Sequence, residues 1–111
     1  MIEKIIYDYM NAEMSVPCYM EEPEVTPEKY VVIEKTGSSR YKQIESATIT
    51  FQSFAPSLYE AAELNEAVKA ALLASTESEH ISSATLNSDY NYTDTTTKRY
   101  RYQAVFDVVF Y

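Results

Sequence analysis

The chain of 111 residues is poor in the residue types on which several common sites depend. It has one glycine, one cysteine, one histidine and no tryptophan. A phosphate-binding loop needs clustered glycines, so a single glycine argues against one. One cysteine and one histidine are too few for a Cys/His zinc cluster, an HExxH motif or a local Ser-His-Asp relay. We therefore expect no catalytic residue, no metal site and no cofactor, and the chain is not predicted to be an enzyme.

Long hydrophobic runs are also missing, and the first residues include Glu3, Lys4 and Asp8 among the apolar ones. A membrane helix needs about 20 apolar residues, and a signal peptide needs a shorter unbroken apolar segment. The sequence predicts neither. Hydrophobic residues nevertheless make up 46 % of the chain, which predicts a folded protein, and residues 1–111 are enough for a single domain with one core.

Basic residues are scarce: the chain has nine of them and seventeen acidic residues, and its formal net charge is −8. Nucleic-acid binding through phosphates needs a concentrated cationic face, so this balance argues against it. Most of the basic residues lie in two clusters. These clusters are interpreted either as two solvated loop ends, or as a basic surface that meets an acidic surface on the next copy of the chain. The two basic clusters are Lys35, Arg40 and Lys42, and Lys98, Arg99 and Arg101.

The remaining candidates for chemistry have ordinary structural interpretations. Cys18 has no CxxC or histidine neighbour, so it is interpreted as a buried small hydrophobe. His80 is interpreted as a surface residue, and residues 21–24 as a solvated acidic loop. Residues 89–94 do not have the spacing of an EF-hand loop and are expected to make Asx-type turns.

The first half of the chain predicts a helix and three strands. Apolar residues at helical spacing indicate an amphipathic helix over residues 2–14, and residues 16–21 indicate a short strand that Pro17 confines to a sheet edge or end. Strands over residues 30–36 and 43–54 form a hairpin. Gly37, followed by two serines, is expected to make the turn in a positive-φ conformation.

The second half predicts a well-capped helix and a second pair of strands. Ser57 and Glu60 form a capping box for a helix that ends near residue 75. Strands are expected over residues 80–89 and 98–111, separated by a polar turn region at residues 87–97. The order α-β-β-β-α-β-β predicts an α+β fold with a mainly antiparallel sheet and two helices.

The aromatic content is high, with 11 tyrosines and 4 phenylalanines. Tyrosines beside arginines near residues 90–102 can stack bases, or they can be sheet or interface residues. From Ala104 onward the last strand is apolar on both faces except at Asp107. Two helices cover one face of such a sheet, and a neighbouring subunit is favoured as the cover for the other.

Three stretches carry a resemblance to small phage and prophage proteins of head–tail morphogenesis: residues 30–37 (YVVIEKTG), 47–55 (ATITFQSFA) and 86–110 (LNSDYNYTDTTTKRYRYQAVFDVVF). With its element order, the whole chain resembles the tail terminator, or tail-to-head joining, proteins of long-tailed phages. The resemblance implies a structural protein that caps the tail tube as a homo-hexameric ring and meets the head connector. It also implies a location in the host cytoplasm during assembly and in the virion afterwards.

Two alternatives to the terminator role stay open: another neck, minor tail or tail-completion protein, and a small nucleic-acid-binding module that uses residues 90–102. No specific nucleic-acid binding and no membrane association are expected. A small enzyme built on His80 and the acidic loop is the least favoured interpretation. The residues expected at a subunit or partner interface are Arg40, Tyr41, Tyr90, Tyr92, Arg99, Arg101, Val105, Val109 and Tyr111.

Overall fold

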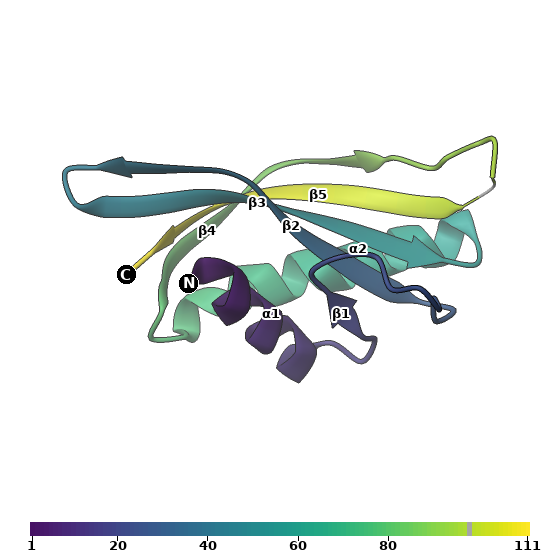
Figure 1. Cartoon of the computed structure of the whole chain (residues 1–111), viewed down its shortest axis with the longest axis horizontal. Helices are drawn as coiled ribbons and strands as arrows, with labels where there is room; N and C mark the ends of the chain where they lie inside the picture. Colours follow the sequence, from purple (N-terminus) through teal and green to yellow (C-terminus); the bar gives the residue numbers. More distant parts are fainter. Residues whose placement is uncertain (98) are drawn as a thin grey trace.

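Five strands form one sheet, and both helices lie against the same face of it (Figure 1). The structure is a computed structural model that describes residues 1–97 and 99–111. The elements in chain order are α1 (Ile2–Glu13), β1 (Cys18–Tyr19), β2 (Tyr30–Tyr41), β3 (Ile44–Ala55), α2 (Leu58–Ala74), the 3-10 turn η1 (Ser75–Glu77), β4 (Ile81–Asn91) and β5 (Tyr100–Phe110). The α+β class and the element order are as expected.

The strand order across the sheet is β1-β2-β3-β5-β4, and every pair is antiparallel except β1 with β2. Strand β1 is only two residues long and lies at the edge, as Pro17 predicted. Asn11 at the end of α1 holds it there, because its amide donates to the Cys18 carbonyl (3.1 Å) and accepts from the Cys18 amide (3.0 Å).

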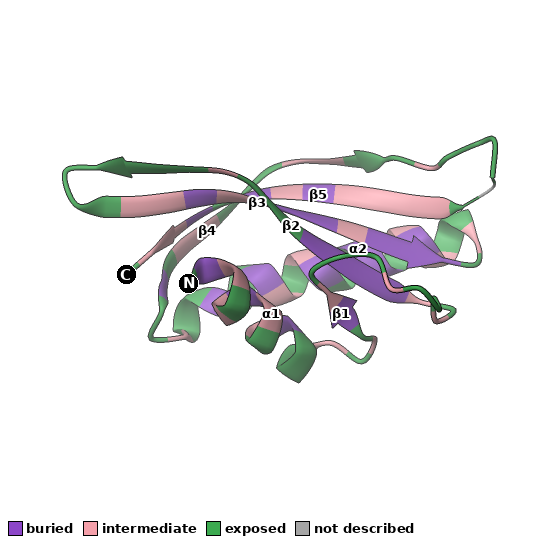
Figure 2. Cartoon of the chain, in the orientation of Figure 1, coloured by how far each residue is buried: buried purple, intermediate pink, exposed green. Residues whose placement is uncertain are grey.

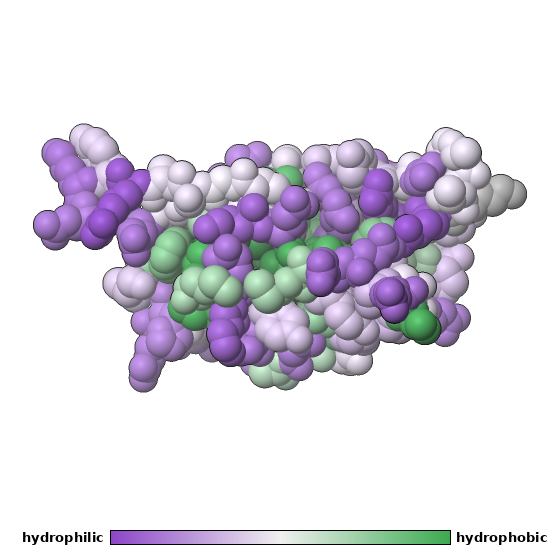
Figure 3. Space-filling view, in the orientation of Figure 1, coloured by the Kyte–Doolittle hydropathy of each residue, from purple (hydrophilic) through white to green (hydrophobic). Residues whose placement is uncertain are grey.

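The end of the β2–β3 hairpin extends beyond the rest of the sheet. The molecule measures 44 × 24 × 24 Å, and the hairpin turn lies at one end of the long axis (Figure 1). The last part of β2 is exposed, whereas its first four residues are buried (Figure 2). The projecting end carries largely hydrophilic side chains (Figure 3).

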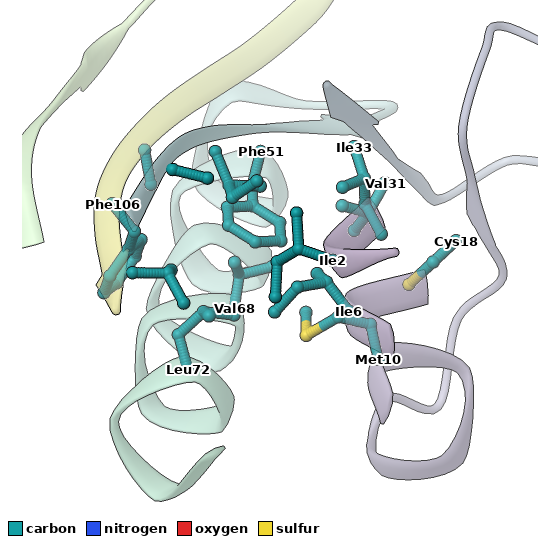
Figure 4. Packing of buried hydrophobic residues seen from close by; sticks show 14 of the residues in the cluster. Ile2, Ile6, Met10, Cys18, Val31, Ile33, Phe51, Val68, Leu72 and Phe106 are labelled. Atoms are coloured by element: carbon teal, nitrogen blue, oxygen red, sulfur yellow. The ribbon is translucent and has the colours of Figure 1, made fainter. Parts of the chain in front are cut away.

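The core lies between the sheet and the two helices, where apolar side chains from both layers point toward one another (Figure 4). The rings of Phe51 and Phe106 meet edge to face at 5.9 Å between centroids. Burying side chains of this kind stabilises the fold by about 1.5–3 kcal/mol each. The buried core residues include Ile2, Ile6 and Met10 of α1, Val68 and Leu72 of α2, and Val31, Ile33, Ile49, Phe51 and Phe106 of the sheet.

The predicted hairpin turn at Gly37 is wrong. Strand β2 continues through Gly37 with an irregularity between Lys35 and Gly37, and Gly37 does not have a positive φ. The turn is made by Lys42 and Gln43, with φ values of 48° and 68°. A two-residue turn of this hand needs positive φ at both central positions, and here non-glycine residues adopt it.

Helix α2 begins as the sequence predicted, with Ser57 as its N-cap. The Ser57 hydroxyl accepts from the Glu60 amide at 3.2 Å and donates to the Glu60 carboxylate at 3.0 Å. In a capping box the Glu60 carboxylate would accept from the Ser57 backbone amide. Here it accepts from the Ser57 hydroxyl instead.

Strand β4 extends further at its C-terminal end than expected. Strand β4 continues to Asn91, into the region predicted to be turn, because its polar residues pair with β5 as far as Tyr102. The predicted start of the last strand at Lys98 lies outside the described residues. No helix in the described part of the chain is long and apolar enough to cross a membrane.

Candidate functional site

The predicted interface residues lie at three separate places on the molecule. One group is at the projecting end of the β2–β3 hairpin and beside it, a second is at the opposite end of the sheet, and a third is on the face that the helices leave uncovered. In this order the groups are Arg40, Tyr41 and Tyr111; Tyr90, Tyr92, Arg99 and Arg101; and Val105 and Val109.

Aromatic rings and Arg101 form a stacked row on the uncovered face. The rings of Tyr30 and Phe54 are parallel within 6° and their centroids are 4.6 Å apart. The guanidinium carbon of Arg101 lies 5.6 Å from the centroid of Phe54 and 4.4 Å from that of Tyr92. Cation–π contacts of this geometry stabilise the row and hold the arginine in place.

Arg99 joins this row to the acidic loop. Its guanidinium forms an ion pair with Glu22, donates to the Tyr30 hydroxyl and lies 5.0 Å from the Phe54 centroid. Burial raises the pKa of Tyr30, and its hydroxyl donates to the Glu22 carboxylate at 2.9 Å. Glu22 therefore holds the loop against the sheet, and the charges of Arg99 and Glu22 are balanced within the chain.

The face of the sheet that the helices leave uncovered carries polar ladders. Gln52 donates to Gln103 at 3.0 Å, and Gln103 donates to the Tyr90 hydroxyl. Thr48 and Asn87 both donate to Asp107, each at 3.1 Å.

Val105 and Val109 are half-buried among these polar rows. The apolar character of β5 does not extend to its neighbours, because β3 and β4 present polar side chains on this face. The face therefore gives a covering subunit less support than the sequence of β5 indicated.

The hairpin tip, residues 40–45, places exposed apolar side chains next to basic ones. Tyr41 is 70 % exposed and Ile44 is 55 % exposed. The ammonium of Lys42 lies 5.4 Å from the Tyr41 ring centroid. Arg40 and Lys42 take part in none of the ion pairs of the described residues, so the tip presents two cations.

An open groove lies where α2 and β5 begin, and it is lined by Tyr59, Ala62, Glu63, Glu66 and Tyr102. Its volume is about 390 Å³. Tyr59 is 76 % exposed. Glu66 pairs with Lys69 at 2.8 Å, and Glu63 has no ion-pair partner among residues 1–97 and 99–111. We call these five residues the acidic groove.

Groups with reactive chemistry do not converge in the described part of the structure. Cys18 is buried, and burial raises the pKa of its thiol to about 11, so the thiolate is scarce at neutral pH. No three His, Cys, Asp or Glu side chains among the described residues are placed to hold a metal ion. Asp94 accepts from the Thr96 amide at 3.0 Å, the Asx-type turn predicted for this region.

Sequence reasoning missed Glu22, Phe54 and Tyr59 as interaction residues. Glu22 and Phe54 meet Arg99 only through the tertiary fold, across long separations in the sequence. Tyr59 had a visible signal, because it is an aromatic residue outside the apolar stripe of a predicted helix.

Among known proteins, no family model matches this chain, and no curated protein matches it either.

Proposed function

We propose that this chain is a structural protein of a phage tail that caps the tail tube as a homo-hexameric ring and joins it to the head connector. The observation that carries the proposal is the projecting hairpin tip, where Tyr41 and Ile44 are exposed beside two cations. Exposed apolar groups at the end of a two-stranded arm add nothing to the core of their own chain, and contact with another protein would cover them. The three stretches that resemble head–tail morphogenesis proteins support the same role.

The charge distribution also supports an assembly role. The chain has a net charge of −8, yet residues 35–45 contain three basic residues and one acidic one. A basic arm on an acidic body favours contacts between unlike surfaces of two copies, which close into a ring when the rotation between neighbours permits. The partners in this proposal are further copies of the chain, the tail tube protein and the connector or neck proteins.

The decisive experiment mixes the purified protein with tubes of the tail tube protein from the same phage genome. Electron microscopy is expected to show a ring of six copies at the tube end, and sedimentation of the protein alone at rising concentration is expected to show self-association. A chain that stays monomeric at high concentration and leaves tube ends bare would overturn the proposal. A density at another position on the neck or tail would favour the neck or tail-completion alternative.

The nucleic-acid alternative has less support from the geometry. Arg99 is paired with Glu22, and Arg101 is stacked between Phe54 and Tyr92. These two cations are therefore engaged within the chain, whereas phosphate binding needs cations that can neutralise a backbone.

A further inference from the structure

The hairpin tip and the acidic groove lie at opposite ends of the long axis (Figure 1). The tip is the turn between β2 and β3, and the groove is formed where α2 and β5 begin. Two different surfaces at opposite ends of one chain suit a contact in which the hairpin tip of one copy meets the acidic groove of the next copy. Such head-to-tail contacts build rings or filaments.

The side chains of the tip are suited to a groove that is both aromatic and acidic. Tyr41 and Ile44 face each other across the hairpin as a cross-strand pair, and both are more than half exposed. Arg40 and Lys42 stand next to them along the chain. The tip therefore offers an apolar pair with one cation on β2, Arg40, and one in the turn, Lys42, while Glu45 on β3 is the cross-strand partner of Arg40.

The acidic groove offers the complementary groups. Tyr59 and Tyr102 supply aromatic rings that accept apolar side chains and cations. Glu63 and Glu66 supply carboxylates on the same lining, and Glu63 has no ion-pair partner among the described residues. The groove is open and about 390 Å³ in volume, which is in the range of about 300–1,000 Å³ for sites that enclose small groups.

We propose that the hairpin tip of one copy docks in the acidic groove of a second copy of this chain. The inference rests on the proposed assembly function and names the two surfaces that make the contact. Charge complementarity favours a second copy as the occupant, because the cations of the tip meet carboxylates that the same chain presents at its other end.

The size of this contact explains how it would behave in solution. Stable interfaces bury about 1,200–2,000 Å² in total, and a hairpin tip in an open groove buries less. A single pair of copies therefore associates weakly. In a closed ring every copy makes the contact twice, once with its tip and once with its groove, so closure on the tail tube stabilises the assembly.

Charge reversal tests the pairing of the two surfaces. Arg40→Glu and Glu63→Lys are each expected to weaken self-association about tenfold at about 0.1 M salt, because each places like charges in contact. The double variant is expected to recover most of the loss. At about 1 M salt the Debye length is only about 3 Å and the effect of each single change is expected to shrink.

Lys4→Glu and Glu13→Lys are the matched controls, because both residues are exposed on α1 and outside the tip and the groove. They change the net charge equally and are expected to leave association within about twofold of the unaltered chain. Equal weakening by the controls, or single variants without effect on a chain that does associate, would overturn the docking proposal.

A cross-link tests the geometry without relying on charge. Chains with Ile44→Cys are mixed with chains with Glu63→Cys under mild oxidation, and a disulfide-linked heterodimer is expected. The native Cys18 is buried and does not compete.

The outcomes separate this inference from the proposed function. Rings that form on tail tubes without the Ile44–Glu63 cross-link would overturn the docking proposal and leave the capping role intact. Loss of tube binding with unchanged self-association after Arg40→Glu would assign the tip to the tube and also overturn it. A chain that neither associates nor binds tubes would overturn both proposals.

Discussion

The ammonium of Lys69 in α2 lies 2.9 Å from the carboxylate of Asp89 in β4. The buried amide of Asn65 donates to the same carboxylate oxygen at 3.0 Å. Asp89 thus fixes the helix against the strand at the edge of the sheet. The contact places the groove-lining turns of α2 relative to β5, because β4 is paired with β5 along its whole length.

Replacing Asp89 with alanine is expected to lower the free energy of unfolding by about 2–3 kcal/mol, because it leaves the buried Asn65 amide without its acceptor and leaves Lys69 with Glu66 as its one remaining ion-pair partner among the described residues. Lys69→Met keeps the Asn65 bond and is expected to cost about 1 kcal/mol. Urea denaturation of the variants measures both values. Equal losses would show that Asn65 does not depend on Asp89.

The Lys69 contact also predicts a dependence on pH. Hydrogen bonds to Glu66 and Asp89 raise the pKa of Lys69 above its ordinary value of 10.5. A raised pKa in the folded state contributes stability below the unfolded pKa, and this contribution is lost as the pH rises through the folded pKa. The part of the stability difference between the unaltered chain and Lys69→Met that comes from the charge is therefore expected to be complete below pH 10.5, to decline as the pH rises further, and to disappear above the raised folded-state pKa. A difference that does not decline over this range would contradict the charged contact.

The turn of the β2–β3 hairpin predicts that a glycine is favourable at position 43 and not needed at position 37, whereas the sequence pattern alone indicates a turn at Gly37. Gln43 has φ 68°, a conformation that costs a non-glycine residue about 1–2 kcal/mol. Gln43→Gly is expected to stabilise the chain by up to about 1 kcal/mol.

Gly37 has no positive φ, and an added Cβ there would meet nothing within 4 Å. Gly37→Ala is therefore expected to stabilise by about 0.5–1 kcal/mol.

Thermal unfolding measures both hairpin variants against Ser38→Ala, a change at an exposed residue of the same strand. Destabilisation by Gly37→Ala would indicate that the turn lies at Gly37 after all. Because Gly37 lies in β2 several residues before the turn that contains Gln43, the effects of the two substitutions are expected to add.

The elements of the fold were predictable where local patterns determine them. The apolar spacing of α1, the Ser57 cap and the alternation in β5 each have a cause within a few residues. The hairpin turn was not predictable, because Lys42 and Gln43 carry none of the usual turn signals and Gly37 carries a strong one. The position of the turn is determined by the pairing register of β2 with β3, in which Tyr41 and Ile44 are the last pair.

The candidate surfaces were predictable only in part, for the same reason. Arg40 and Tyr41 could be placed on a hairpin, and the hairpin does project. That Arg99 would pair with Glu22 depends on a contact between segments 77 residues apart, which no local pattern encodes.

The Arg99–Glu22 pair predicts how the acidic loop is held. Arg99→Gln removes the ion pair and the bond to the Tyr30 hydroxyl, so amide hydrogen exchange in residues 20–29 is expected to become faster. Exchange in α2 is expected to stay unchanged and serves as the internal control. Glu22→Gln should accelerate the same amides less, since Arg99 keeps its contacts with Tyr30 and Phe54. Unaltered exchange in both variants would show that the loop is held by other contacts.

Cys18 gives the last prediction, because its burial should make it unreactive in the native state. Burial raises the pKa of its thiol from 9.0 to about 11, and two pKa units reduce the thiolate fraction about 100-fold at neutral pH. Alkylation at pH 8 is therefore expected to be at least about 100-fold slower in the folded chain than in urea. The denatured chain, whose thiol has its ordinary pKa, is the control. A native rate near the denatured one would mean that β1 opens readily from α1, despite the two bonds with which Asn11 holds Cys18.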